Sequence, residues 1–352
     1  MSREKIYKAI EPHPYYPVKL YHDGTFHQPK ESEAPELSIS DIEKRTVRDT
    51  SFLINALDGR LDSDLLGKHF LDGKERYEGP CDAAIYLDKS ARPVRALVSE
   101  FWDKFSDRPK PPHASFLNID KINYLLEMGF TKRDIQERSI GLEEISLDKM
   151  DEKFVQLRTA EIRALYIKNR KLLPEIEQLI QDVQSDARSP DELDVLWQYP
   201  TFLDDKHVAI VDEVKSSGAT LSIADQLLQR SFPDARFEPL FWSTPPTLTY
   251  DIELPDGRVV KGIADTEKPL WYNSKTSDGR GGIGNVNFEK AARSRYALSR
   301  IGKHIIGVPY AAENNGRVDR YGNHLRQDFK TMRLRLDSGE IAMPPDGRRW
   351  DN

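Results

Sequence analysis

Apolar residues along the chain form two strand–loop–helix units. In the first unit, Ala83–Leu87 is a short apolar run that predicts a buried strand, and residues 88–93 form the loop after it. The next stretch, Val94–Phe105, places its apolar residues on one helical face, which predicts an amphipathic helix. Prolines gather at residues 108–112 and mark the end of this unit, because prolines at that density end a helix.

The second unit begins with Val208–Val211, the strongest candidate for a buried strand because it is short, continuous and rich in β-branched residues. A loop containing Gly218 follows, and Thr220–Arg230 then carries apolar residues at helical spacing. The pattern of Phe237–Trp242 predicts the next strand. Two such units followed by a strand predict an α/β fold, with a mainly parallel sheet, flanking helices and right-handed crossovers.

The remaining sequence predicts further regions around this core. Residues 1–36 are rich in proline and are expected to form an extended N-terminal arm. The core is expected at 37–245, with a helical insertion at about 113–200, and residues 246–352 form a C-terminal accessory region. Local signals within these regions are hairpin turns at Asp23-Gly24 and Pro255-Asp256-Gly257, a capping box at Ser40-Asp41-Ile42-Glu43 and a helix start at Pro174.

Charge, apolar content and cysteine count exclude several classes of protein. The net charge of −6 argues against a surface that is basic throughout, so nucleic acid is not an expected partner. No apolar run reaches the length of a signal peptide or a membrane span, and a cytoplasmic protein is expected. The single cysteine, Cys81, excludes an intramolecular disulfide and a zinc site built on several thiolates. We interpret it as a small buried apolar residue, and the histidines show no spacing typical of a metal site.

The segment Val208–Thr220 carries the candidate chemistry. Its buried strand ends at two adjacent acids, Asp212 and Glu213, and ligands of parallel sheets bind beyond the carboxyl ends of the strands. Adjacent strand residues point to opposite faces, so one carboxylate should meet the ligand more directly than the other. Carboxylates can accept hydrogen bonds from a ribose diol or hold Mg²⁺. Backbone amides around Gly218, nearby hydroxyls and the positive end of the following helix suit a phosphate.

This segment resembles the phosphoribosyl pyrophosphate (PRPP) binding motif of type I phosphoribosyltransferases: four apolar residues, two acids, then a short loop with a hydroxyl residue, glycine, any residue and threonine. The resemblance implies that Asp212 and Glu213 bind the ribose and Mg²⁺. It implies a 5-phosphate loop formed by Lys215, Ser216, Ser217, Gly218, Ala219 and Thr220. Many purine-type members carry an acid where this chain has Ser216, which weakens an assignment to hypoxanthine or guanine salvage.

The loop of the first unit matches a second feature of that family, the diphosphate-binding loop after the first core strand. The resemblance implies that Lys89, Ser90 and Arg92 bind the leaving group, although the loop contains no glycine. A surface turn with solvated charges is the alternative interpretation. The C-terminal region would be the variable hood that selects the acceptor, with Trp271 and Tyr272 as candidate stacking residues.

The expected activity is Mg²⁺-dependent transfer of 5-phosphoribose from PRPP to a nitrogenous base, with Asp212, Glu213, Lys89 and Arg92 as the candidate catalytic residues. Expected ligands are PRPP or a nucleoside monophosphate and a purine or pyrimidine base. A homodimer is one expected assembly, and no membrane partner is expected. The alternatives are a regulatory module that binds PRPP or a nucleotide without transfer, and a hydrolase of a phosphoribosyl substrate.

Overall fold

A four-stranded sheet in the order β4-β3-β5-β6 forms the centre of the molecule, and each neighbouring pair of strands is parallel. Its strands are β3 (Ala83–Asp88), β4 (His113–Asn118), β5 (His207–Val214) and β6 (Arg236–Ser243). This computed structural model describes residues 18–22, 25–27, 39–60, 70–71, 77–88, 91–137, 140–214, 218–243, 247–253, 259–265 and 329–341. The sequence prediction of a mainly parallel α/β sheet is confirmed.

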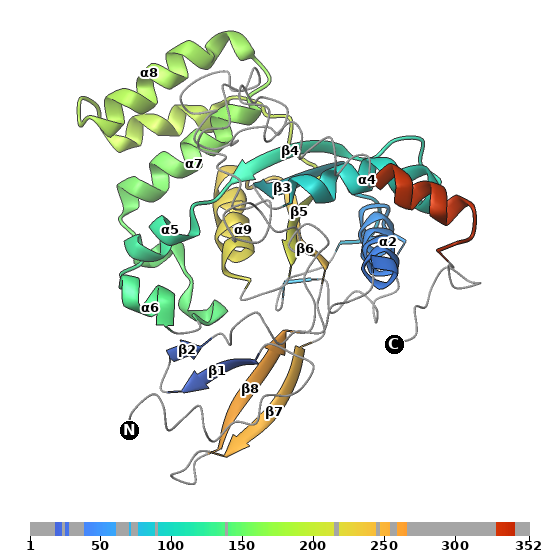
Figure 1. Cartoon of the computed structure of the whole chain (residues 1–352). Coiled ribbons are helices and arrows are strands. Elements are labelled where there is room, and N and C mark those ends of the chain that lie inside the picture. The colour runs from blue at the N-terminus through green and yellow to red at the C-terminus, as the bar shows by residue number, and fades with distance from the viewer. Residues whose placement is uncertain are drawn as a thin grey trace, which may run out of the picture.

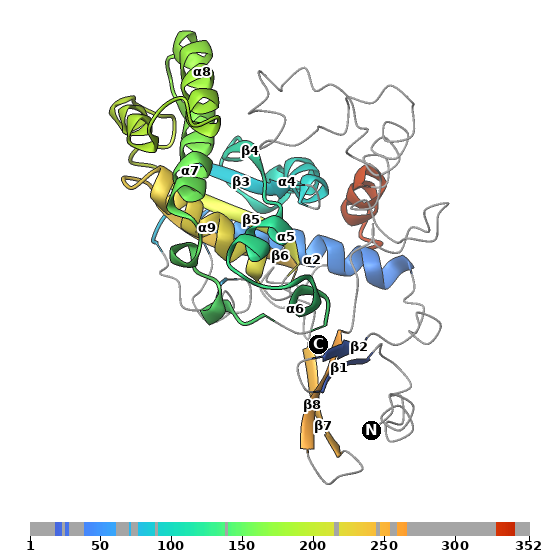
Figure 2. The ribbon, with the colours of Figure 1, turned by 90° about the vertical axis from the view of Figure 1, so that its left-hand side faces the viewer.

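Helices cover both faces of this sheet, which explains the uninterrupted apolar runs of its central strands. On one face lie α2 (Ile39–Leu57), α4 (Arg92–Phe105) and a helix at 329–337 (Figure 1). Tyr86 and Val211 point to this side. Ile85 and Ile210 point to the other face, where α9 (Ala219–Ser231) and α7 (Glu152–Tyr166) pack (Figure 2).

Helices fill the chain between β4 and β5. These are α5 (Lys121–Glu127), α6 (Lys132–Glu137), α7 and α8 (Leu173–Gln184), with 3-10 helices η2 (Leu142–Glu144), η3 (Leu147–Lys149), η4 (Arg170–Leu172) and η5 (Pro190–Gln198). The expected helical insertion began at about residue 113, and this boundary is wrong, because 113–118 form β4. Pairing with β3 over the register Ala83↔His113 to Asp88↔Asn118 makes this stretch a strand. The helical segment therefore starts after β4.

A second, antiparallel sheet joins distant parts of the chain in the order β2-β1-β8-β7. Its strands are β1 (Val18–His22), β2 (Thr25–His27), β7 (Thr247–Glu253) and β8 (Val259–Asp265). The pairs β1–β2 and β7–β8 confirm both predicted hairpins. The expected N-terminal arm therefore contributes two strands to a sheet with the C-terminal region. Among the described residues, none of the helices combines the length and apolar character needed to cross a membrane.

Candidate functional site

The two loops predicted to hold PRPP begin at the same edge of the sheet. Strands β3 and β5 are direct neighbours, with a parallel register from Ala83↔Val208 to Tyr86↔Val211. The chain leaves β3 toward β4 on one side and leaves β5 toward β6 on the other side. The strand order thus reverses between β3 and β5, and such a reversal creates the crevice in which ligands of open α/β sheets bind.

Asp212 is the more accessible of the two acids at this edge. Its carboxylate is half-buried and lies on the α9 side, whereas Glu213 is only 4 % exposed and is directed to the opposite face by the alternation of side chains along the strand. Burial raises the pKa of Asp212 to about 6, while the Glu213 N–H and the charge of Lys121 act in the opposite direction. Two acids on opposite faces cannot both bind one ion directly, so the structure does not bring the two predicted Mg²⁺ ligands together at one point.

Gly218 begins α9 in a left-handed backbone conformation, with φ of 72°. A left-handed residue at this point is strained for any side chain but costs glycine little. A Cβ built on Gly218 would lie 3.0 Å from Cδ1 of Leu71 and 3.2 Å from Cδ2 of Leu142, so the loop passes close to two apolar side chains. Ala219 and Thr220 follow in the first turn of α9, where helices generally favour anions.

Part of the predicted site lies outside the described residues. These positions are Lys89, Ser90, Lys215, Ser216 and Ser217, and for Arg92 the description covers only the backbone at the start of α4. Trp271 and Tyr272, the candidate stacking residues, also lie outside it. The assigned roles of these residues therefore stay predictions.

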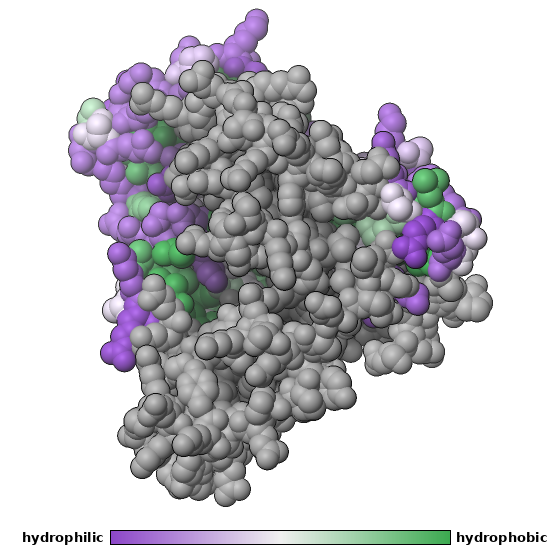
Figure 3. Space-filling view, in the orientation of Figure 1, coloured by the Kyte–Doolittle hydropathy of each residue, from purple (hydrophilic) through white to green (hydrophobic). Residues whose placement is uncertain are grey.

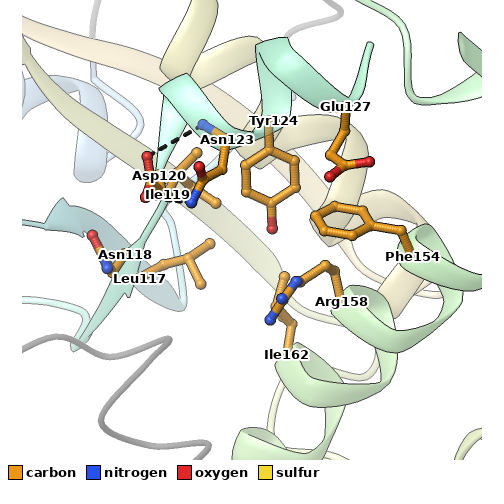
Figure 4. Close-up of a pocket in the computed structure, with 10 residues that line it drawn as sticks. All are labelled: Leu117, Asn118, Ile119, Asp120, Asn123, Tyr124, Glu127, Phe154, Arg158 and Ile162. Atoms are coloured by element: carbon orange, nitrogen blue, oxygen red, sulfur yellow. Dashed lines mark hydrogen bonds between the residues drawn. The ribbon is translucent and has the colours of Figure 1, made fainter. Parts of the chain in front are cut away.

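A pocket of about 290 Å³ opens near the carboxyl end of β4, between α5 and α7 (Figure 4). Aromatic rings form one part of it: Tyr124 and Phe154 meet edge to face, with centroids 5.6 Å apart, and the Arg158 guanidinium lies 5.0 Å from the centre of the Phe154 ring. Its ten lining residues are Leu117, Asn118, Ile119, Asp120, Asn123, Tyr124, Glu127, Phe154, Arg158 and Ile162. In Figure 3, apolar residues gather at the surface beside α5 and α6.

Polar groups at one end of the pocket are held by the start of α5. Asp120 is the N-cap of this helix, and its carboxylate accepts hydrogen bonds from the backbone N–H and the side-chain amide of Asn123, at 3.4 Å and 2.8 Å. The sequence prediction missed this pocket, because it assigned no candidate site to the helical insertion at about 113–200. The Asp120-x-x-Asn123 helix start directly after a strand end was the local signal that could have identified it.

A third group of chemically capable residues lies at the opposite, amino-terminal edge of the sheet. The ligand atoms of Cys81, His207 and Glu238 all lie within 4.8 Å of one another, and all three residues are buried. Burial of Cys81 agrees with the sequence interpretation, but its two polar neighbours were not foreseen.

Comparison with known proteins adds no further assignment. No protein-family model matches the chain, and no curated protein matches it with significant sequence similarity.

Proposed function

We propose that the chain is a PRPP-binding protein of the type I phosphoribosyltransferase kind, which transfers 5-phosphoribose to a nitrogenous base and releases pyrophosphate. The observation that supports this proposal best is the parallel pairing of β3 with β5. It brings the acid-ended strand, the left-handed Gly218 and the end of β3, from which the next loop starts, to one edge of the sheet. A ribose, its 5-phosphate and a diphosphate leaving group need three such elements side by side.

The proposed reaction breaks the bond from ribose C1 to the pyrophosphate oxygen and forms a bond from C1 to a base nitrogen, which loses a proton. Positive charge develops on the ribose in the transition state, and negative charge develops on the departing diphosphate. Ionised Asp212 would bind the ribose diol and Mg²⁺, and the α9 N-terminus would hold the 5-phosphate. Lys89 and Arg92 would stabilise the leaving group. Bound Mg²⁺ would neutralise diphosphate charge.

The pocket beside β4 is the best-supported location for the acceptor base. Asp212 follows Val211, which pairs with Tyr86, and the next β3 residue, Leu87, pairs with Leu117 of the pocket wall. Asp212 on β5 and Leu117 on β4 therefore lie at the same level of the sheet, with β3 between them. Their backbones are about 10 Å apart, which is twice the spacing of neighbouring strands. A phosphoribosyl group and a base can bridge that distance. Aromatic rings beside amide and carboxylate groups suit a flat heterocycle with polar edges.

A PRPP-binding regulator without transfer activity is the second candidate. It is favoured by the residue 88–93 loop, which contains no glycine that would let backbone amides approach a diphosphate closely. Hydrolysis of a phosphoribosyl substrate is the third candidate, since water could take the place of the base. The three activities give different products from PRPP: a nucleotide, no product, or free ribose phosphate.

The test is a product analysis with PRPP, Mg²⁺ and a panel of purine and pyrimidine bases, combined with calorimetric binding of PRPP. Asp212→Asn with Glu213→Gln is expected to weaken PRPP binding, since each hydrogen bond to a charged group contributes about 1.5–3 kcal/mol. The matched control, Glu175→Gln with Glu177→Gln on α8, removes two charges away from the sheet edge. Unchanged PRPP affinity in the first double variant would refute the site.

Tyr124→Phe tests the acceptor pocket separately. It removes one hydroxyl from the lining and keeps the ring against Phe154. We expect a higher KM for the base and an unchanged PRPP affinity. An unchanged KM for every base, in a wild-type protein that does make nucleotide, would move the acceptor site elsewhere.

A further inference from the structure

Three side chains with different donor atoms converge at the amino-terminal edge of the sheet. The Sγ atom of Cys81 lies 3.8 Å from Nε2 of His207, and the same Nε2 lies 3.1 Å from Oε2 of Glu238. The three residues are 0 %, 3 % and 4 % exposed. Sulfur, imidazole nitrogen and carboxylate oxygen therefore face one point in the interior, at the opposite end of the strands from Asp212.

The sheet itself fixes this arrangement. His207 begins β5, and its backbone N–H donates to the carboxylate of Asp82 at 3.0 Å, while the Asp82 N–H donates to the His207 carbonyl at 2.8 Å. Glu238 comes from β6, where it pairs with Ala209. The N–H of Cys81 donates to the carbonyl of Leu57 at the end of α2. Backbone pairing thus holds the three side chains in place.

The geometry differs from that of a catalytic relay. In a cysteine–histidine–carboxylate relay, one ring nitrogen faces the thiol and the other faces the carboxylate. Here both partners lie beside Nε2 of His207, which carries either a proton for the Glu238 carboxylate or a lone pair for the Cys81 thiol, but not both. Burial also raises the pKa of the Cys81 thiol, the opposite of an activated nucleophile. A shared point beside one nitrogen is instead the arrangement of ligands around a cation.

We propose that Cys81, His207 and Glu238 form a binding site for a zinc ion. With Zn–S near about 2.3 Å and Zn–N and Zn–O near about 2.0–2.1 Å, tetrahedral geometry places S and N about 3.6 Å apart and N and O about 3.3 Å apart. The two separations in the structure are 3.8 Å and 3.1 Å. A thiolate with an imidazole suits zinc, whereas Mg²⁺ and Ca²⁺ take oxygen ligands.

Zinc binding would displace the thiol proton of Cys81 to solvent and leave a thiolate–metal bond, with His207 neutral and Glu238 ionised. A water molecule would complete the four ligands. The rings of Tyr77 and His207 meet edge to face, with centroids 5.7 Å apart, and Arg236 lies over the Tyr77 ring, so these residues cover the site on one side. Its ligands come from β5, from β6 and from the residue two positions before β3. The ion would therefore tie these strands together at the edge away from the proposed PRPP site.

The experiment is metal analysis of the purified full chain, followed by chelation and titration with Zn²⁺ and with Co²⁺. We expect one zinc per chain, and a Co²⁺ complex with a thiolate charge-transfer band and intense visible bands. Cys81 is the single cysteine, so a thiolate band can come only from this site. This readout uses wild-type protein and does not depend on whether a variant folds.

Substitutions then assign the ligands. Cys81→Ala and His207→Gln are expected to abolish the thiolate band and to lower zinc affinity at least tenfold, with circular dichroism reporting the fold. His113→Gln is the matched control, because His113 begins β4 at the same edge but is exposed; it should bind as wild type does. Wild-type protein that takes up Co²⁺ without a thiolate band, or that binds no metal, would overturn the site. Undiminished zinc affinity in folded Cys81→Ala would also overturn it.

Discussion

The backbone N–H of Glu213 donates a hydrogen bond to Oδ1 of the preceding residue, Asp212, at 2.8 Å. This contact holds the Asp212 carboxylate against the end of β5 and favours its ionised form. Burial has the larger effect and opposite sign, so the pKa of Asp212 is raised to about 6. An acid in this state stays protonated in the folded chain at pH values where the unfolded chain has already released the proton.

The raised pKa gives Asp212 a defined effect on stability. Between about pH 4 and pH 6 the folded chain binds more protons at this site, so its contribution to the free energy of unfolding falls as pH rises through that window. Asp212→Asn removes the titration. In chelator, urea unfolding should show the variant to be more stable than wild type above pH 6, by up to about 3 kcal/mol, with the difference shrinking toward pH 4. A difference that is constant with pH would contradict the raised pKa.

Gly218 is expected to be more sensitive to alanine than Gly339, another glycine with a left-handed backbone. Gly339 has a φ of 82°, and an added Cβ there would have no atom within 4 Å. The variant Gly339→Ala therefore measures only the free-energy cost of placing a side chain on a left-handed backbone. That cost is about 1–2 kcal/mol. Gly218→Ala should lose more in urea unfolding, because its Cβ also presses on Leu71 and Leu142. Equal losses in the two variants would show that these leucine side chains move aside freely.

Arg163 is expected to be a major contributor to the stability of the helical region before β5. Its buried guanidinium donates to the carbonyls of Leu196, Ser231 and Tyr199, at 2.9, 2.7 and 3.0 Å. Arg163→Met removes these three hydrogen bonds from buried carbonyls and should lower the free energy of unfolding by about 3 kcal/mol or more. The control is Arg188→Met, because the Arg188 side chain is 50 % exposed. This substitution should lower the free energy of unfolding by less than about 1 kcal/mol. Similar losses in both variants would contradict the prediction.

Lys89→Ala with Arg92→Ala separates transfer from binding. A contact that strengthens as charge develops on the leaving diphosphate lowers the barrier, whereas one equally strong in the ground state only tightens binding. For an enzyme, we expect turnover to fall by about 10²–10³. Affinity for a nucleoside monophosphate, which lacks the diphosphate, should change little. Wild-type protein that binds PRPP but makes no nucleotide with any base would favour the regulator.

Local sequence patterns predicted the elements whose residues carry their own periodicity. The apolar runs of β3 and β5 and the helical spacing of α4 and α9 are visible within a few residues, and all four elements are present. Strand β4 was missed because His113–Asn118 alternates weakly, with half-buried residues at most positions. It forms a strand because six of its residues pair with β3. A short window of sequence does not contain this pairing.

Sites built across strands were harder to predict than sites built within one segment. The acids and Gly218 occupy one stretch of seven residues, so a motif could identify them. Cys81 and His207 are 126 residues apart and meet only because the strand order makes β3 and β5 neighbours. The pocket lining likewise combines α5 with α7. Spacing rules for metal ligands cannot identify a group that depends on the register of a sheet, and the helix start at Asp120 was the one local sign of the pocket.

The pairing of β3 with β5 has a consequence for how the chain is made. Asp82 and His207, which bond across this pair, are 125 residues apart, and the intervening chain forms β4 and a helical segment. During synthesis, β3 therefore leaves the ribosome long before β5 exists, with one edge of an apolar strand open. Contacts over such separations are slow to form. Helices form through contacts between residues close in sequence, so we expect the helical segment to form before β5 pairs with β3.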